Sequence, residues 1–403
     1  MQSESIPNDV AKILSNSSMH IENFFSIKKL SCNFKNVNII IGPQAAGKSL
    51  IIKLVAFFTS VFNFTWSVST LAKFDFEKLE SVIIANFTAI FPNEYIKNEN
   101  FVIDFRYKNF IISIYKKNKK IVVNFNNEFI DFLTSVKKSD DFGIDHFIKE
   151  FLITENPFPD YLFIPDNRSL FTSVIKNNIF KMILQGKKVK MDYFLKNFAA
   201  RYEEFVKNAN ESINTHEFKE IFHGEYHKID NEEFIINNNK KIKLEYGSSG
   251  QQEVISLLLA LHAQENSKNT VVCIEEPEAH LFPSTQKLLI EHIISTYSKM
   301  GRNSQFWMTT HSPYVLTTIN NLIAAHTVGS IDKKSTQVEE IISKKYWLPF
   351  DDVSCWYIND GILIDLMNAD TKLIKVNEID NISDQLASDF DKLLELEYGE
   401  EYD

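Results

Sequence analysis

The chain has 403 residues, of which 44% are hydrophobic, and this is enough to form one large or two medium domains with buried cores. The formal net charge of −10 argues against a protein that coats nucleic acid, although it leaves room for a local basic patch. The three cysteines show no paired spacing, so neither disulfides nor a zinc site is predicted. The N-terminus has no secretory features and no apolar run is long enough to span a membrane, which predicts a cytoplasmic protein.

The first motif lies between a predicted strand and a predicted helix. Residues 37–41 are mostly β-branched, the segment GPQAAGKS follows, and apolar residues then recur at helical spacing. This is the context of a phosphate-binding Walker A loop, whose glycines let backbone N–H groups point at phosphate oxygens. Lys48 would reach the β- and γ-phosphates of ATP and Ser49 would hold Mg²⁺, whereas the alternative is an ordinary turn with a chance lysine. The predicted ATP-binding residues are Gly42, Pro43, Gln44, Ala45, Ala46, Gly47, Lys48 and Ser49.

The middle of the chain predicts further strands and helices. Residues 61–98 read as helical, and residues 100–126 alternate in polarity with turns at Asn109 and Asn118, which predicts an antiparallel meander. The lysines of its second turn could contact nucleic acid, but a solvated turn is the simpler explanation. Residues 131–230 read as largely helical, with amphipathic pieces at 173–184 and 194–213.

A second candidate phosphate site is the segment SSGQQ, which leads directly into a strong helix. Ser248, Ser249 and Gly250 lie at the predicted helix N-terminus, where free N–H groups and the helix dipole favour an anion. Read alone, the same segment is better explained as an ordinary N-cap.

Two later strands end in residues that can carry chemistry. The buried strand 271–274 leads into Glu275 and Glu276, and adjacent carboxylates are costly there unless a cation or a water uses them. Glu275 could orient the water shell of Mg²⁺ and Glu276 could act as general base on the attacking water, whereas the alternative is a solvated strand end. The strand that begins near position 304 ends before His311, at the edge where parallel sheets bind ligands, although a lone histidine is usually structural.

Taken in order, the four motifs resemble the head of ABC-type ATPases, which is shared with SMC proteins. The spellings GPQAAGKS, SSGQQE, EEPEAHLFP and TTHSP are similar to those of the OLD-like group of ATPases. The resemblance implies an α/β fold with an ABC/SMC-like P-loop ATPase head, in which a mixed sheet includes the antiparallel meander. It also implies ATP and Mg²⁺ as ligands, with Ser49 and Glu275 on the metal, Glu276 as the catalytic glutamate and His311 as a catalytic switch histidine.

The resemblance further implies a shared site between two copies of the chain. The signature loop of one head contacts the γ-phosphate of the nucleotide held by a second head, so ATP joins a head-to-tail dimer. One departure is the lack of a suitable Q-loop glutamine, since Gln185 lies in a basic turn; Asp166, Asn167 or Arg168 could take its place. The implied signature residues are Ser248, Ser249, Gly250 and Gln251.

The implied domain organisation has four parts. The head's N-terminal half, with the Walker A loop and the meander, spans 1–130, and a mainly helical insertion spans 131–230. The head's C-terminal half, with the signature, the Walker B acids and the switch histidine, spans 231–335. A C-terminal extension spans 336–403 and ends in an acidic amphipathic helix, which either packs on its own head or docks another subunit.

The expected function follows from the same resemblance. OLD nucleases carry an additional acidic α/β unit after the switch histidine; because the sequence shows none, no intrinsic nuclease activity is expected. Related stand-alone ATPases act in bacterial anti-phage defence with a separate effector, so the expected role is an ATP-hydrolysing sensor or scaffold that controls an effector such as a nuclease. The ATPase subunit of PARIS-like systems is a specific candidate. The alternatives are an SMC-like DNA-repair ATPase that acts on DNA, and a transporter ATPase, which would need a Q-loop.

Overall fold

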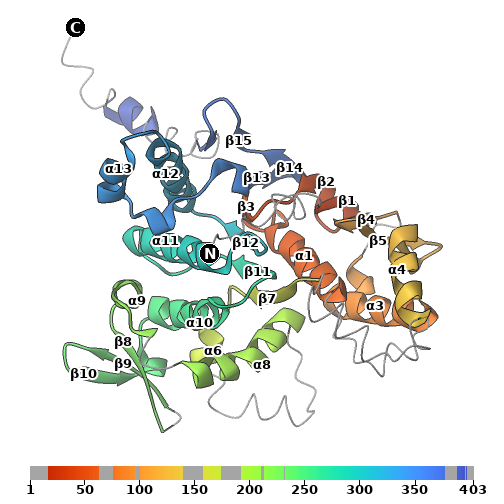
Figure 1. The fold of residues 1–403 in the computed structure, drawn as a ribbon, viewed down its shortest axis with the longest axis horizontal. Coiled ribbons are helices and arrows are strands. Elements are labelled where there is room, and N and C mark those ends of the chain that lie inside the picture. The colour runs from red at the N-terminus through yellow and green to blue at the C-terminus, as the bar shows by residue number, and fades with distance from the viewer. Residues whose placement is uncertain are drawn as a thin grey trace, which may run out of the picture.

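The computed structural model describes residues 17–62, 76–96, 100–138, 158–173, 192–209, 213–230, 232–376, 388–394 and 396. Its centre is a mixed sheet of eleven strands with helices on both faces, which confirms the expected mixed α/β fold (Figure 1). The strands, in their order across the sheet, are β6 (Lys120–Phe125), β5 (Phe110–Lys117), β4 (Val102–Tyr107), β1 (Ser18–Phe24), β2 (Ile27–Asn33), β14 (Ile362–Asp365), β13 (Val353–Asn359), β3 (Val37–Ile41), β12 (Gln305–Thr310), β11 (Thr270–Glu275) and β7 (Asp160–Ile164).

The half of the sheet from β13 to β7 is parallel, and its inner strands β3, β12 and β11 are buried along their whole length. Ile41 lies opposite Thr310, and Glu275 lies opposite Thr309. Parallel strands in this register end at one edge of the sheet, so the segments that follow β3, β11, β12 and β7 are brought together there.

The other half of the sheet is antiparallel and contains the predicted meander. β4, β5 and β6 pair in sequence, with turns at Lys108–Asn109 and Asn118–Lys119. Lys108, Asn118 and Lys119 have positive φ angles of 55°, 51° and 65°, as tight hairpin turns require. The lysines of the second turn are exposed at 117, 119 and 120, and a contact with nucleic acid stays a prediction.

The β13–β14 hairpin joins the two halves, and the sequence analysis did not predict it. β13 pairs with β3 in parallel, and β14 pairs with β2 through Ile362 and Lys29. The Lys28 and Lys29 amides both donate to the Gly361 carbonyl, which closes the seam. Residues assigned from sequence to a C-terminal extension therefore lie in the middle of the sheet.

Two hydrophobic cores lie on opposite faces of the sheet. Strand residues alternate between them: Trp307 joins the first core, whereas its neighbours Phe306 and Met308 join the second. The first core contains α1 (Lys48–Phe62) and α3 (Phe76–Ile90). The second contains α8 (Tyr193–Asn208), α9 (His216–Phe222), α10 (Ser249–Gln264), α11 (Pro283–Met300) and α12 (Pro313–Gly329).

The remaining elements are a small second sheet and several short helices, strands and turns. A three-stranded sheet formed by β8 (Glu225–Ile229), β9 (Glu232–Asn237) and β10 (Lys240–Lys243) lies beside α9, at the lower left of Figure 1. No helix in the described residues is long and apolar enough to cross a membrane. The other elements are α4 (Asn127–Lys138), α6 (Ser169–Ser173), α13 (Ser335–Ile341), the pair β15 (Met367–Asn368) and β16 (Leu373–Ile374), and the short 3₁₀ turns Asn93–Tyr95, Leu244–Tyr246, Lys344–Tyr346 and Phe350–Asp352.

Several sequence predictions fall on parts of the chain that are not described. Gln185 and nearly all of the predicted helix at 173–184 lie outside the described residues. Of the predicted acidic tail helix, 388–394 and 396 are described and are helical, and Phe390 and Leu393 expose 60% and 62% of their surface. The rest of that helix lies outside the described residues.

Candidate nucleotide-binding site

The loop between β3 and α1 is held by its two glycines. Gly47 has a φ of +110°, and a Cβ there would lie 2.8 Å from the Ser26 hydroxyl. A Cβ on Gly42 would lie 2.3 Å from the Ile358 carbonyl of β13, so the close approach of that strand also requires glycine. Ala45 has a φ of 62°, another left-handed position in the same loop. The backbone is therefore constrained on both sides before any ligand binds.

Lys48 is the first residue of α1, and its ammonium lies inside the curve of this loop. The group donates to the carbonyls of Gly42 and Pro43, at 2.9 Å each, and lies 2.9 Å from Nε2 of His311. The side chain is only 4% exposed, and burial lowers its pKa, although the nearby Glu276 carboxylate acts in the opposite direction. A buried cation held by loop carbonyls is a favourable partner for a phosphate anion.

Glu276 and His311 meet at the same point from two neighbouring strand ends. Glu276 Oε1 lies 3.1 Å from Nε2 of His311, the nitrogen that Lys48 also contacts. One nitrogen either donates to the carboxylate or accepts from the ammonium, so the two contacts compete. Glu276 has a φ of 41°, which is unusual outside glycine, and its amide donates to the Thr309 carbonyl and hydroxyl.

Glu275 and Ser49 provide side-chain oxygen atoms that are suitable ligands for Mg²⁺. Glu275 is 3% exposed, and burial raises its pKa to about 7, whereas Lys53 and a hydrogen bond from Ser49 act to lower the pKa. A divalent cation would stabilise the buried carboxylate. Within the described ranges no group of three His, Cys, Asp or Glu side chains is arranged to hold a metal. One carboxylate and one hydroxyl nevertheless fit Mg²⁺, which takes its other ligands from phosphate and water.

The raised pKa of Glu275 makes the stability of the metal-free protein depend on pH. The folded pKa is about 7 against 4.5 for an ordinary glutamate, so the folded state binds more protons between these values. The free energy of unfolding should then fall as the pH rises through this window, by a few kcal/mol at most, since one pKa unit is about 1.4 kcal/mol. Thermal unfolding without Mg²⁺ is expected to show a steeper loss with rising pH in the wild type than in Glu275→Gln. Parallel profiles for the two proteins would contradict this.

The Glu278 side chain holds the backbone at His311, a contact that the sequence analysis did not predict. Its Oε1 accepts from the Thr310 hydroxyl at 2.6 Å and from the His311 amide at 2.9 Å. Ser312 then donates to the same Thr310 hydroxyl. Glu278 is 8% exposed, and burial raises its pKa. The turn after β11 thus fixes the end of β12.

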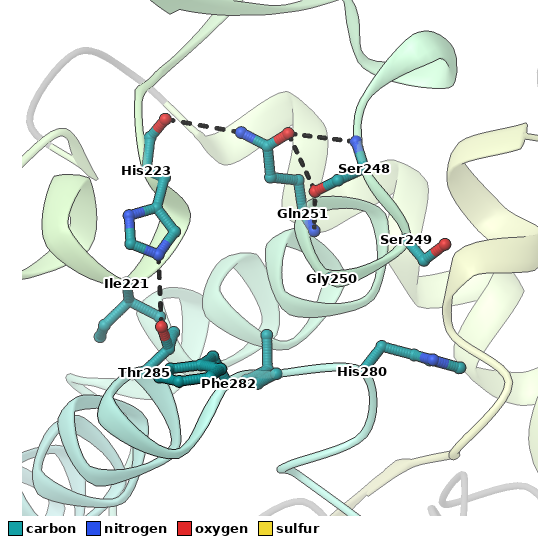
Figure 2. Close-up of a pocket in the computed structure, with 10 residues that line it drawn as sticks. Ile221, His223, Ser248, Ser249, Gly250, Gln251, His280, Phe282 and Thr285 are labelled. Atoms are coloured by element: carbon teal, nitrogen blue, oxygen red, sulfur yellow. Dashed lines mark hydrogen bonds between the residues drawn. The ribbon is translucent and has the colours of Figure 1, made fainter.

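The segment 248–252, here called the signature segment, forms a capped helix start and part of the wall of a pocket (Figure 2), whereas its binding of phosphate stays a prediction. The Ser248 hydroxyl accepts from the Gln251 amide N–H, and the Gln251 side chain accepts from Ser248 and donates to the Phe222 carbonyl. The side chains of Ser248 and Gln251 are therefore both engaged in hydrogen bonds with other groups of the same chain. Ser249 is exposed, so its hydroxyl and the first N–H groups of α10 are the groups left for a phosphate.

The pocket beside this segment has a volume of about 410 Å³ and lies between α9, α10 and α11. Figure 2 shows His223, His280, Phe282 and Thr285 around it, with His223 Nε2 3.2 Å from the Thr285 hydroxyl. Its lining includes no residue of the loop 42–49. The structure therefore brings together Lys48, Ser49, the two strand-end glutamates and His311, and places the signature segment elsewhere.

The turn that was considered in place of a Q-loop lies beside these residues. Asp166 is close enough to Glu275 to raise the pKa of that carboxyl, and its own side chain accepts from the backbone and side chain of Asn167. Arg168 is fully buried and donates to the carbonyls of Glu275 and Glu276. Arg168 thus contacts the backbone of the strand-end glutamates and Asp166 affects the pKa of Glu275, whereas Asn167 forms its hydrogen bonds within the turn.

Residues 163–316 match the sequence family described as the AAA ATPase domain. No curated protein matches the chain. One similar solved structure is an SMC head bound to the C-winged helix domain of ScpA, with 14% identity over 88% of this chain and 98% of that chain and a TM-score of 0.43. The RecF recombination mediator shares 14% identity over 88% and 99%, with a TM-score of 0.39. The SMC head of Thermotoga maritima shares 11% over 87% and 97%, with a TM-score of 0.38.

Proposed function

We propose that this chain, whose residues 163–316 match the AAA ATPase domain, binds and hydrolyses ATP in a site completed by a second copy of itself. The observation that carries the proposal is the convergence of three residues from three strand ends. Nε2 of His311, after β12, lies 2.9 Å from the Lys48 ammonium, after β3, and 3.1 Å from Oε1 of Glu276, after β11. A cation for phosphate, a carboxylate base and an imidazole are the groups that phosphoryl transfer to water uses.

Each residue of this group has a distinct proposed role. Lys48 would exchange the carbonyls of its own loop for phosphate oxygens, which frees Nε2 of His311 to donate to Glu276. Glu276 would accept the proton of the attacking water, and His311 would hold that carboxylate in place. Ser49 and Glu275 would hold Mg²⁺, which when bound neutralises phosphate charge and aligns the oxygens for transfer.

The proposal of a shared site rests on where the signature segment lies. α1 and α10 belong to cores on opposite faces of the sheet, and the pocket of Ser249 includes no Walker A residue. Yet Ser249 and the start of α10 have free groups suited to a phosphate. Both facts are explained if Ser249 acts on the nucleotide held by a second copy.

The shared site can be tested by mixing two inactive variants. Lys48→Ala removes the phosphate cation, and Ser249→Arg blocks the signature segment at an exposed position where the larger side chain should not disturb folding. Each variant alone should be inactive. An equal mixture should recover about one quarter of the wild-type rate, because half of the randomly formed dimers carry one intact site of two. A mixture as inactive as its components would show that each site belongs to one copy.

The finer role proposed is control of a separate effector, such as a nuclease, in bacterial anti-phage defence. Its support is the spelling of the four motifs, GPQAAGKS, SSGQQE, EEPEAHLFP and TTHSP. Hydrolysis would then switch the geometry of the dimer and release the effector. Purification together with the products of the flanking genes, followed by mass spectrometry of the complex, would identify the effector. Binding to DNA ends in place of any protein partner would favour the SMC-like DNA-repair alternative.

A further inference from the structure

Arg168 is a buried charge that the roles proposed above do not explain. It follows β7, and 0% of its surface is exposed. Burying a guanidinium is costly unless its donors and its charge are matched by fixed partners. The partners of Arg168 come from two separate parts of the molecule.

On one side, the guanidinium contacts the backbone after β11. Nη1 donates to the Glu275 carbonyl at 2.6 Å and to the Pro165 carbonyl at 2.9 Å, and Nη2 donates to the Glu276 carbonyl at 3.0 Å. The ladder between β7 and β11 ends at Ile164. On the β7 side, Arg168 therefore holds the backbone of the two glutamates beyond the end of that ladder, whereas β12 holds Glu275 on the other side.

On the other side, Arg168 and the short helix α6 contact α10, the helix that starts at the signature segment. Nε lies 3.5 Å from Oε2 of Glu253, which is 3% exposed, and the Ser256 hydroxyl donates to the Arg168 carbonyl at 3.5 Å. Thr172 on α6 contacts the Gln252 side chain, at 3.4 Å. The side-chain amide of Gln252 also donates to the Glu245 and Gly247 carbonyls, at 3.0 and 2.9 Å, just before the signature segment.

We propose that Arg168 is a positioning residue that couples the signature helix to the two strand-end glutamates. A displacement of α10 would move Glu253 and hence the guanidinium, and with it the Glu275 and Glu276 carbonyls. The inference rests on the proposed function for its consequence: engagement of Ser249 by a second copy would set the backbone that carries the general base. It assigns Arg168 no contact with nucleotide.

The chemistry of the side chain explains why an arginine is required here. Its planar group offers several donors in a fixed geometry, so it can bond three carbonyls and face a carboxylate at once. A lysine keeps the charge but presents a single nitrogen on a flexible stem. Arg168→Lys should therefore preserve the charge balance with Glu253 and lose the rigid link.

The test compares Arg168→Lys with a matched control, Arg201→Lys. Arg201 also donates to a carbonyl of β7, that of Tyr161, but at the strand's other end. We expect Arg168→Lys to bind a fluorescent ATP analogue with wild-type affinity and to lower kcat about 10- to 100-fold. In the nucleotide-free protein, amide hydrogen exchange should rise both at 247–253 and at 275–279, and stay unchanged in α1. Arg201→Lys should change neither measurement.

Two results would overturn the inference. One is unchanged exchange at both segments, and the other is a loss of nucleotide affinity as large as the loss of kcat. The exchange measurement needs no ATP, so it remains decisive even if the wild type proves not to hydrolyse ATP, a result that would refute the proposed function. If Arg168→Lys does not fold, Glu253→Gln, which keeps the shape and removes the counter-charge, is expected to give the same pattern and is judged by the same results.

Discussion

Glu276→Gln is expected to bind ATP as tightly as the wild type, to hydrolyse it about 10²- to 10⁴-fold more slowly and to accumulate as an ATP-bound dimer. The amide keeps the shape of the carboxylate and can still accept from Nε2 of His311, 3.1 Å away in the wild type. It cannot take a proton from water. The backbone bonds from the residue to Thr309 do not involve the side chain and should persist.

The measurement pairs steady-state phosphate release with the mass of the protein in solution, with and without ATP. Glu291→Gln is a suitable control, because Glu291 is also a largely buried glutamate, paired with Lys287 at 2.6 Å on α11. That variant should hydrolyse ATP at the wild-type rate, and its ATP-bound dimer should dissociate at the wild-type rate. A wild-type rate in Glu276→Gln would mean that a different group accepts the proton, and the role proposed for this glutamate would be wrong.

The strand ends that form the site were predictable because each motif combines a residue type with a local backbone event. A β-branched run followed by glycines predicts β3 and its loop, and a buried run followed by two acids predicts β11. Parallel pairing then brings these ends together without further information. The resemblance to ABC-type ATPase heads joined Lys48, Glu276 and His311 in one site, and the structure brings the three side chains together.

The features that could not be predicted depend on contacts between distant segments. β13 has no periodic signal that shows its neighbour, and it lies beside β3 although Val353 is more than 300 residues from Val37 in the chain. Gly42 was read as a phosphate-loop glycine, yet the Ile358 carbonyl also excludes a side chain there. The contacts of Glu278 could not be predicted either, because its two partners come from the end of β12. Local sequence patterns do not show which distant segments pair with each other.

In the signature segment, the structure confirms the N-cap, and the phosphate site stays a prediction. The sequence SSGQQ was read either as an N-cap or as a phosphate site, and Ser248 with Gln251 does form a capping box. The cap orders the first turn of α10 and fixes the direction of its free N–H groups. Capping does not use the Ser249 hydroxyl, so the cap is compatible with the phosphate contact proposed for Ser249.

Lys48→Ala is expected to raise the Kd for ATP by more than about a hundredfold, which corresponds to about 3 kcal/mol. Hydrogen bonds to charged groups are worth roughly 1.5–3 kcal/mol each, and the ammonium is positioned to make more than one with phosphate oxygens. Folding should survive, because the substitution removes a buried cation whose present partners, the Gly42 and Pro43 carbonyls and the His311 ring, belong to loop residues. The variant should also fail to dimerise on addition of ATP.

Calorimetric titration with ATP and Mg²⁺ measures this loss directly, and thermal unfolding without nucleotide shows whether the fold is intact. Lys116→Ala is the matched control, since Lys116 likewise donates to a backbone carbonyl, that of Ile96, but does so on β5. Equal affinities for Lys48→Ala and Lys116→Ala would refute a phosphate-binding role for the loop 42–49. Loss of binding with an unchanged unfolding temperature would instead locate the effect in the phosphate contact. If Lys48 mainly stabilised its own loop, its removal would lower both the affinity for ATP and the unfolding temperature.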